Sequence, residues 1–141
     1  MFGLGRQARE RRDALKIIIQ AMEWASYREL LNLPPEPGTT DRATLAEQLM
    51  ARVSKWPRRK FAGRVLPNPS PLGLAMEALA YGLDDMSSRP ADQQQVIGAL
   101  GRVLKYAAQH PDKINDADYE LFQIFGPRFV NHPAVAKAEA A

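Results

Sequence analysis

The pattern of hydrophobic and polar positions predicts helices along the whole chain. The most apolar stretch is 71–86, PLGLAMEALAYGLDDM, and Glu77 is its only charge before the last three residues. A helix that is apolar nearly all round is a buried helix. Ser70 suits the N-cap, and Pro71 suits the first helical position, where no N–H is needed. We therefore expect 71–86 to be a buried central helix, wrapped by the other helices.

A long amphipathic pattern precedes it. No proline or glycine lies between Arg6 and Pro34, and apolar residues recur at helical spacing over 6–33. At a rise of about 1.5 Å per residue this helix is a rod of roughly 40 Å, about as long as the whole domain, so its N-terminal end can project. Its apolar face is expected to contain Leu15, Ile17, Ile18, Ile19, Met22, Trp24, Ala25, Leu30, Leu31 and Leu33.

Three further main helices are predicted, bounded by prolines and capping residues. The second runs from Thr40 or Asp41 to Trp56, the fourth from Pro90 to Gln109 and the fifth from Asn115 or Asp116 to about Phe125. Residues 133–141 allow a short sixth helix, and strand signals are weak everywhere. The predicted fold is all-α: a single compact domain, 1–141, of five main helices around the buried helix at 71–86.

The basic, proline-rich segment 57–70, PRRKFAGRVLPNPS, separates the second helix from the central one. Its prolines are incompatible with a regular helix, and the one strand-like run is too short for a sheet. Long loops inside compact domains are usually functional or mobile. We expect this segment to be a loop that presents its four cations and one aromatic residue.

Composition narrows the class of protein. The 141 residues are 45% hydrophobic and 25% charged, which is ordinary for a globular protein. Cysteine is absent, which excludes disulfides, thiolate nucleophiles and thiolate metal sites. The absence fits a reducing compartment. No apolar run reaches the roughly 20 residues that a membrane-spanning helix needs. We expect a cytoplasmic protein that does not contact a membrane.

Charge is distributed unevenly along the chain. The net charge is +3, but residues 1–64 carry 13 Lys and Arg against 7 Asp and Glu, a net of +6, and residues 65–141 carry 6 against 9, a net of −3. The first half is therefore suited to an acidic partner. Asp84 and Asp85 are unfavourable at a helix C-terminus, so we expect them to pair with cations from the first half.

The candidate motifs for catalysis or cofactor binding lack the neighbouring residues or elements that those sites require. Residues 3–8 match G-x-G-x-x-A, but the dinucleotide fingerprint needs a strand before it. The acids of 112–120 lack the glycine and final glutamate of a calcium loop, so we interpret them as capping and first-turn acids. His110 and His132 have no H-E-x-x-H pattern. We predict no enzymatic activity, no cofactor and no metal site.

Basic and aromatic residues remain as the candidate site. Our first hypothesis is a protein-binding adaptor, regulatory or inhibitor module that meets an acidic protein surface. The second is a non-specific nucleic-acid binder that uses the same cations, and the third is a self-associating structural protein paired through its first helix. Aromatic anchors dominate many interfaces, although Trp24 and Trp56 fit a monomer core equally well. The candidate residues are Arg9, Arg11, Arg12, Lys16, Trp24, Trp56, Arg58, Arg59, Lys60, Phe61 and Arg64.

Overall fold

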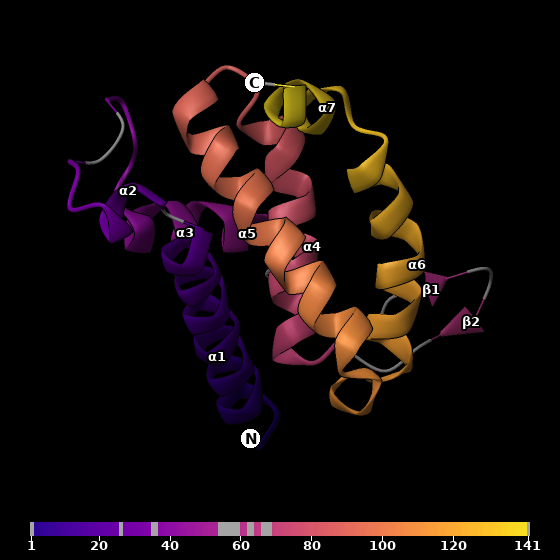
Figure 1. Cartoon of the computed structure of the whole chain (residues 1–141). Helices are drawn as coiled ribbons and strands as arrows, with labels where there is room; N and C mark the ends of the chain where they lie inside the picture. Colours follow the sequence, from indigo (N-terminus) through magenta and orange to yellow (C-terminus); the bar gives the residue numbers. More distant parts are fainter. Residues whose placement is uncertain are drawn as a thin grey trace.

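Helices account for nearly all of the regular structure, as predicted (Figure 1). A computed structural model describes residues 2–25, 27–34, 37–53, 60–61, 64–65 and 69–140. The elements are α1 (Phe2–Ala25), α2 (Tyr27–Leu30), α3 (Arg42–Met50), the 3-10 turn η1 (Ala51–Val53), β1 (Lys60–Phe61), β2 (Arg64–Val65), α4 (Pro71–Asp85), α5 (Pro90–Gln109), the 3-10 turn η2 (Pro111–Lys113), α6 (Asp116–Val130) and α7 (Pro133–Ala140).

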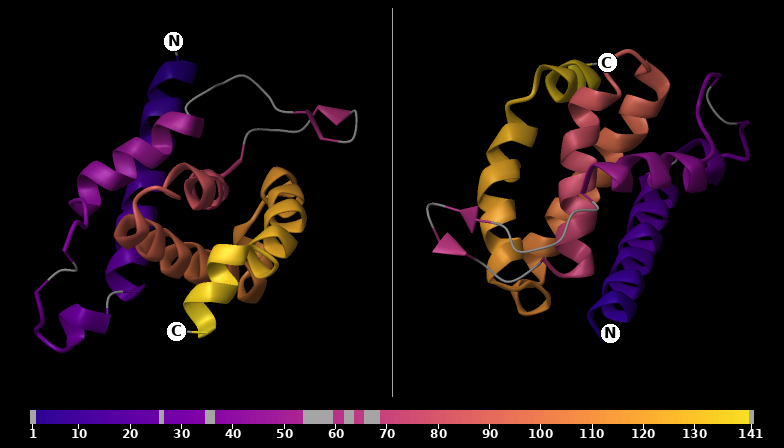
Figure 2. Two further views of the ribbon diagram at one scale, coloured as in Figure 1. Left: turned by 90° about the horizontal axis from the view of Figure 1, so that it is seen from above. Right: turned by 180° about the vertical axis from the view of Figure 1, so that it is seen from behind.

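Helix α4 is the buried central helix that the apolar pattern predicts. Figure 2 shows it between α1 and α6, and it packs against α1, α3, α5 and α6. Ser70 caps it by accepting a hydrogen bond from the Gly73 backbone, with Pro71 in the first turn. Every residue from Gly73 to Leu79 is buried, including Glu77 at 1% exposure. The all-round apolar surface therefore has neighbours on all sides.

The first helix differs from the prediction at both ends. Helix α1 begins at Phe2, four residues before the expected start, and ends at Ala25 instead of continuing to Leu33. The separate turn α2 follows and closes at Asn32, whose φ of 55° is left-handed. Asparagine tolerates that conformation, and the closing bond from Leu33 N to Arg28 O (2.8 Å) is typical of helix ends. A local turn thus ends the helical segment before Pro34.

The second predicted helix has the expected core face but is shorter. Asp41 caps α3 by accepting a hydrogen bond from Thr44 N (3.1 Å), and a 3-10 turn continues to Val53. Its apolar face lies in the core, as the spacing predicts, and Trp56 lies outside the described residues. The buried residues of α3 and η1 are Leu45, Ala46, Leu49, Met50 and Val53.

The segment 57–70 contains one regular feature that the sequence did not predict. Strands β1 and β2 pair antiparallel, with Lys60 opposite Val65 and Phe61 opposite Arg64. Two residues per strand form a hairpin and not a sheet layer, so the all-α class is unaffected. The hairpin lies beyond α6, across α4 from α1 (Figures 1 and 2).

Among the C-terminal helices, α6 extends further than predicted. Helix α5 has the predicted bounds, but α6 continues through Gly126 and Pro127 to Val130, five residues past the expected end. Pro127 removes one backbone donor from the helix interior, and it lies at an exposed position near the end of the helix. The short α7 docks through Val135, which is 2% exposed.

Candidate interaction surface

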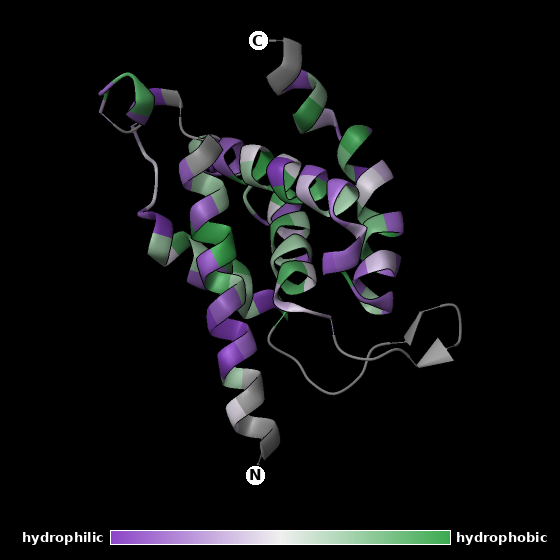
Figure 3. Ribbon diagram, turned by 60° about the horizontal axis from the view of Figure 1, so that its bottom comes forward, coloured by the Kyte–Doolittle hydropathy of each residue, from purple (hydrophilic) through white to green (hydrophobic). Residues whose placement is uncertain are grey.

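Three cations of α1 lie on the face turned away from the core. Arg9, Arg12 and Lys16 are exposed, whereas Ala14 and Ile18 are fully buried. Each helical residue turns by about 100°, so this spacing places the three cations within about 60° of one another and on the side opposite Ile18. Figure 3 shows the same part of α1 as a hydrophilic band near the N-terminal end. We call Arg9, Arg12 and Lys16 the basic ridge.

Arg11, the fourth cation predicted for this site, points the other way. Its guanidinium forms an ion pair with Glu47 (Nη2 to Oε2, 3.3 Å) and donates a hydrogen bond to the carbonyl of Met50 (3.4 Å). Met50 ends α3, where carbonyl oxygens lack helical partners and a cation is favourable. Arg11 therefore fixes α1 against α3, and it is engaged inside the chain instead of facing a partner.

Other arginines are also neutralised by acids of this chain. Arg42 pairs with Glu29 at 2.6 Å, and Arg52 pairs with Asp85 at 2.8 Å. The second pair confirms that Asp85 meets a cation of the first half, whereas Asp84 instead contacts His132 (2.9 Å). No ion pair or hydrogen bond joins the basic ridge to the described residues of the chain. The three charges of the ridge are therefore exposed and unpaired within the part of the chain that the structure describes.

Two exposed cations on α5 were missed by sequence reasoning. Arg102 and Lys105 lie on the outward side of the helix that packs beside α1. Their spacing of three residues puts them on one face, opposite the apolar face that identified α5 as a helix. Reading the polar face of α5 as well as its apolar face could have found them.

Seven predicted site residues remain, and the structure describes the backbone of four of them. Trp56, Arg58 and Arg59 lie outside the described residues. The backbone of the other four is described, at Trp24 on α1 and at Lys60, Phe61 and Arg64 in the hairpin, but their side chains are not. Because the hairpin and α1 lie on opposite sides of α4, the structure does not bring the two predicted basic segments together (Figure 2).

Three leucines predicted for the apolar face of the first helix are exposed. Leu30, Leu31 and Leu33 have 76%, 52% and 45% of their surface accessible. The prediction placed them on the apolar face of one helix that continues to residue 33. Leu30 instead ends the separate helix α2, and Leu31 and Leu33 flank the turn at Asn32. We call these three residues the leucine patch. Single exposed leucines are common, but adjacent ones are characteristic of contact surfaces.

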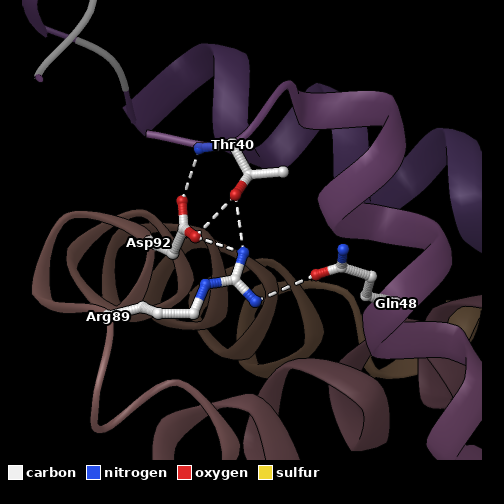
Figure 4. A network of polar contacts seen from close by, with 4 residues as sticks. All are labelled: Thr40, Gln48, Arg89 and Asp92. Atoms are coloured by element: carbon white, nitrogen blue, oxygen red, sulfur yellow. Dashed lines mark hydrogen bonds and ion pairs between the residues drawn. The ribbon is translucent and has the colours of Figure 1, made fainter. Parts of the chain in front are cut away.

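A buried polar network joins α3 to α5 (Figure 4). Asp92 is fully buried and accepts hydrogen bonds from the backbone N–H and the hydroxyl of Thr40, both at 2.7 Å. Arg89 pairs with Asp92 and donates to the Thr40 hydroxyl (2.6 Å) and to Gln48 (3.1 Å). Burial opposes ionisation, but these hydrogen bonds and the Arg89 charge outweigh it and lower the pKa of Asp92. Every partner belongs to the chain, which indicates a structural role.

A second buried carboxylate lies at the start of α6. Asp118 is fully buried and accepts hydrogen bonds from the backbone N–H (2.9 Å) and the hydroxyl (2.5 Å) of Ser70 and from the backbone N–H of Asn115 (3.0 Å). Burial raises the pKa of Asp118, and these hydrogen bonds offset that rise only in part. The Asn115 side chain in turn accepts from Asp118 N, so these residues form the predicted capping arrangement.

The histidines make local contacts. The His110 ring stacks on Tyr106 with centroids 4.1 Å apart, and its Nδ1 lies 3.0 Å from the Tyr106 carbonyl. His132 Nδ1 accepts a hydrogen bond from Ala134 N (3.1 Å), which places the proton on Nε2, facing Asp84. Within the described ranges, no group of three or more His, Asp and Glu residues is arranged to hold a metal ion.

Comparisons with known proteins do not assign this chain to a family. No protein-family model, no curated protein and no solved structure matches this chain. Among the described helices, none combines the length and apolar character required to cross a membrane. The functional argument therefore rests on the surfaces described above.

Proposed function

We propose that this protein is a non-enzymatic helical module that binds a protein partner through an acidic surface on that partner. The basic ridge of α1 is the contact we assign. The module would act by occupying its partner, as an adaptor, regulator or inhibitor. The proposed setting is the cytoplasm, on the ground that the chain has no cysteine.

One contrast carries the proposal. Arg11 is turned inward and paired with Glu47, whereas Arg9 and Lys16 on the same helix are exposed and meet no acid among the described residues. Exposed charges are individually inexpensive to leave solvated, and short basic clusters are common. A row of three on one rigid helix face is better suited to a charge-complementary partner than scattered cations are.

Attraction between the ridge and an acidic partner acts mainly before the two proteins touch. Contacts between charged rims chiefly speed association and depend on salt. We therefore expect partner binding to slow when the ridge is reversed in charge.

The test compares two double variants with equal charge changes. Arg9→Glu with Lys16→Glu reverses two of the three ridge charges. Lys113→Glu with Lys137→Glu changes two other exposed cations, on η2 and α7. Affinity capture from an extract of the native host, treated with nuclease, should recover a protein partner with the wild type and with the control. The ridge variant should not recover it. Equal capture by both variants would contradict the proposal.

Nuclease treatment separates this proposal from nucleic-acid binding. Salt alone does not, because the ridge would bind an acidic protein surface or a phosphate backbone through the same charges. Capture that is abolished by nuclease would replace the protein partner with a nucleic acid. Capture of a protein that persists after nuclease treatment supports the proposal.

A further inference from the structure

His132 contacts two different groups through its two ring nitrogens. Its Nδ1 accepts a hydrogen bond from the Ala134 backbone N–H (3.1 Å), and its Nε2 lies 2.9 Å from Asp84 Oδ1. A ring nitrogen that accepts a hydrogen bond carries no proton, so the proton of the neutral ring is on Nε2 and is donated to the carboxylate. One neutral tautomer therefore satisfies both partners at once.

The contact with Ala134 caps a helix. Ala134 lies in the first turn of α7, where backbone N–H groups have no helical acceptor. The His132 carbonyl accepts the first helical bond, from Ala136 N (3.1 Å), and its side chain accepts from the turn that follows. This is the arrangement of an N-cap residue. Because Asp84 belongs to α4, the same ring also joins the start of α7 to the central helix.

Protonation of the ring would remove the cap and keep the contact with Asp84. The second proton can be added only at Nδ1, which would then be a donor facing the N–H of Ala134. The charged ring would also lie at a helix N-terminus, where the dipole disfavours a cation. The compensating attraction to Asp84 is weak, because 83% of the Asp84 side chain is exposed and solvent screens exposed ion pairs.

Other charged groups on the neighbouring elements are directed elsewhere. Asp85, also on α4, is paired with Arg52 (2.8 Å). Arg128, in the last turn of α6, lies over the Phe125 ring, and Lys137 on α7 is exposed. Among the described side chains, the carboxylate at the end of α4 is thus the one charged group in contact with the ring.

We propose that His132 is a proton-sensitive latch on α7: the neutral ring holds the helix in place, and protonation in mild acid loosens it. Imidazole side chains ordinarily change charge between about pH 5 and 8. Helix α7 packs against α6 and buries Val135, so opening of the latch would expose apolar surface that is covered at neutral pH. The latch does not depend on the basic ridge or on its partner.

Amide hydrogen exchange of the full chain tests the proposal, measured at about pH 7.5 and 5.5 and corrected for the intrinsic exchange rate. In the wild type, protection of the α7 amides should fall in acid by about threefold to tenfold, the effect of losing one helix cap. His132→Asn should remove this dependence, because asparagine caps helices well and does not titrate. His110→Asn is the matched control and should behave like the wild type.

A further variant distinguishes the cap from the ion pair. Asp84→Asn removes the charge that partly compensates protonation, so the loss of α7 protection in acid should be larger than in the wild type. Protection in the wild type that is constant with pH, or that rises in acid, would overturn the proposal. An equal loss in His132→Asn would do so too, because the titrating group would then lie elsewhere.

Discussion

The Asp118 side chain lies in the space that a side chain at Gly73 would need: a Cβ atom placed on Gly73 would lie 1.8 Å from Asp118 Oδ1. The first turn of α4 and the first turn of α6 therefore meet at a point where only glycine fits. Asp118 uses this approach to reach both polar groups of Ser70, the residue that caps α4. One carboxylate thus fixes where the central helix begins relative to α6.

Gly73→Ala should destabilise the protein strongly. The clash is with a buried, hydrogen-bonded carboxylate, which cannot move without losing its bonds to Ser70. We expect the free energy of unfolding to fall by about 2–4 kcal/mol, measured by urea denaturation. Gly126→Ala is the control, since a Cβ there meets nothing within 4 Å. That change should be neutral or stabilise by up to about 1 kcal/mol, and equal losses in both would contradict the assignment.

Asp118 should make the protein more stable in mild acid. Burial raises the pKa of Asp118 above the ordinary aspartate value, so the folded state holds the proton more tightly than the unfolded state does. The free energy of unfolding contributed by this group then rises as pH falls through the interval between the raised and the ordinary pKa. The stability difference between wild type and Asp118→Asn, from urea series at several pH values, should widen toward acid. A difference that narrows toward acid would show that the sign is wrong.

Asp92 should behave in the opposite way. Although burial opposes its charge, the hydrogen bonds from Thr40 and the Arg89 guanidinium lower the pKa of Asp92. Its contribution is complete above the ordinary aspartate value and is lost as pH falls from there through the lowered pKa. The stability advantage of the wild type over Asp92→Asn should therefore shrink in strong acid. An advantage that is constant with pH would mean that Asp92 titrates alike in both states.

Alanine substitutions at Arg11 and Arg9 should differ in their effect on stability. Arg11→Ala removes the contacts with Glu47 and with the end of α3, and the free energy of unfolding should fall by about 0.5–1 kcal/mol, because the pair is partly solvated. Arg9→Ala should change stability by less than about 0.5 kcal/mol, as for other exposed substitutions. Thermal melts of the two variants provide the comparison. If Arg9→Ala is the more destabilising, the ridge has a folding role that its exposure does not indicate.

Local patterns were sufficient for several elements. Helix α5 has the predicted bounds because Pro90 and His110-Pro111 stop helical hydrogen bonding from within the segment itself. Helix α4 was predictable as the central helix because no amphipathic packing could bury an apolar surface that extends around the whole circumference. The Asn115 cap at the start of α6 was predictable from the same kind of local signal.

The candidate surfaces were less predictable, for a physical reason. Periodicity assigns residues to a face, but it does not say how far a neighbouring helix covers that face. Arg11 and Arg9 look equivalent in the sequence, and only the position of Glu47 on α3 separates the engaged cation from the exposed one.

Residue types and their spacing along single helices were enough to predict an all-α chain, its central helix and an excess of positive charge in the first half. The packing of one helix against another was needed to show that Arg11 is paired and Arg9, within the described residues, is not, that Leu30 is exposed, and that Gly73 lies against Asp118. Each of these features depends on where a second element of the chain lies in space. The pattern of residues along a single helix carries no information about that position.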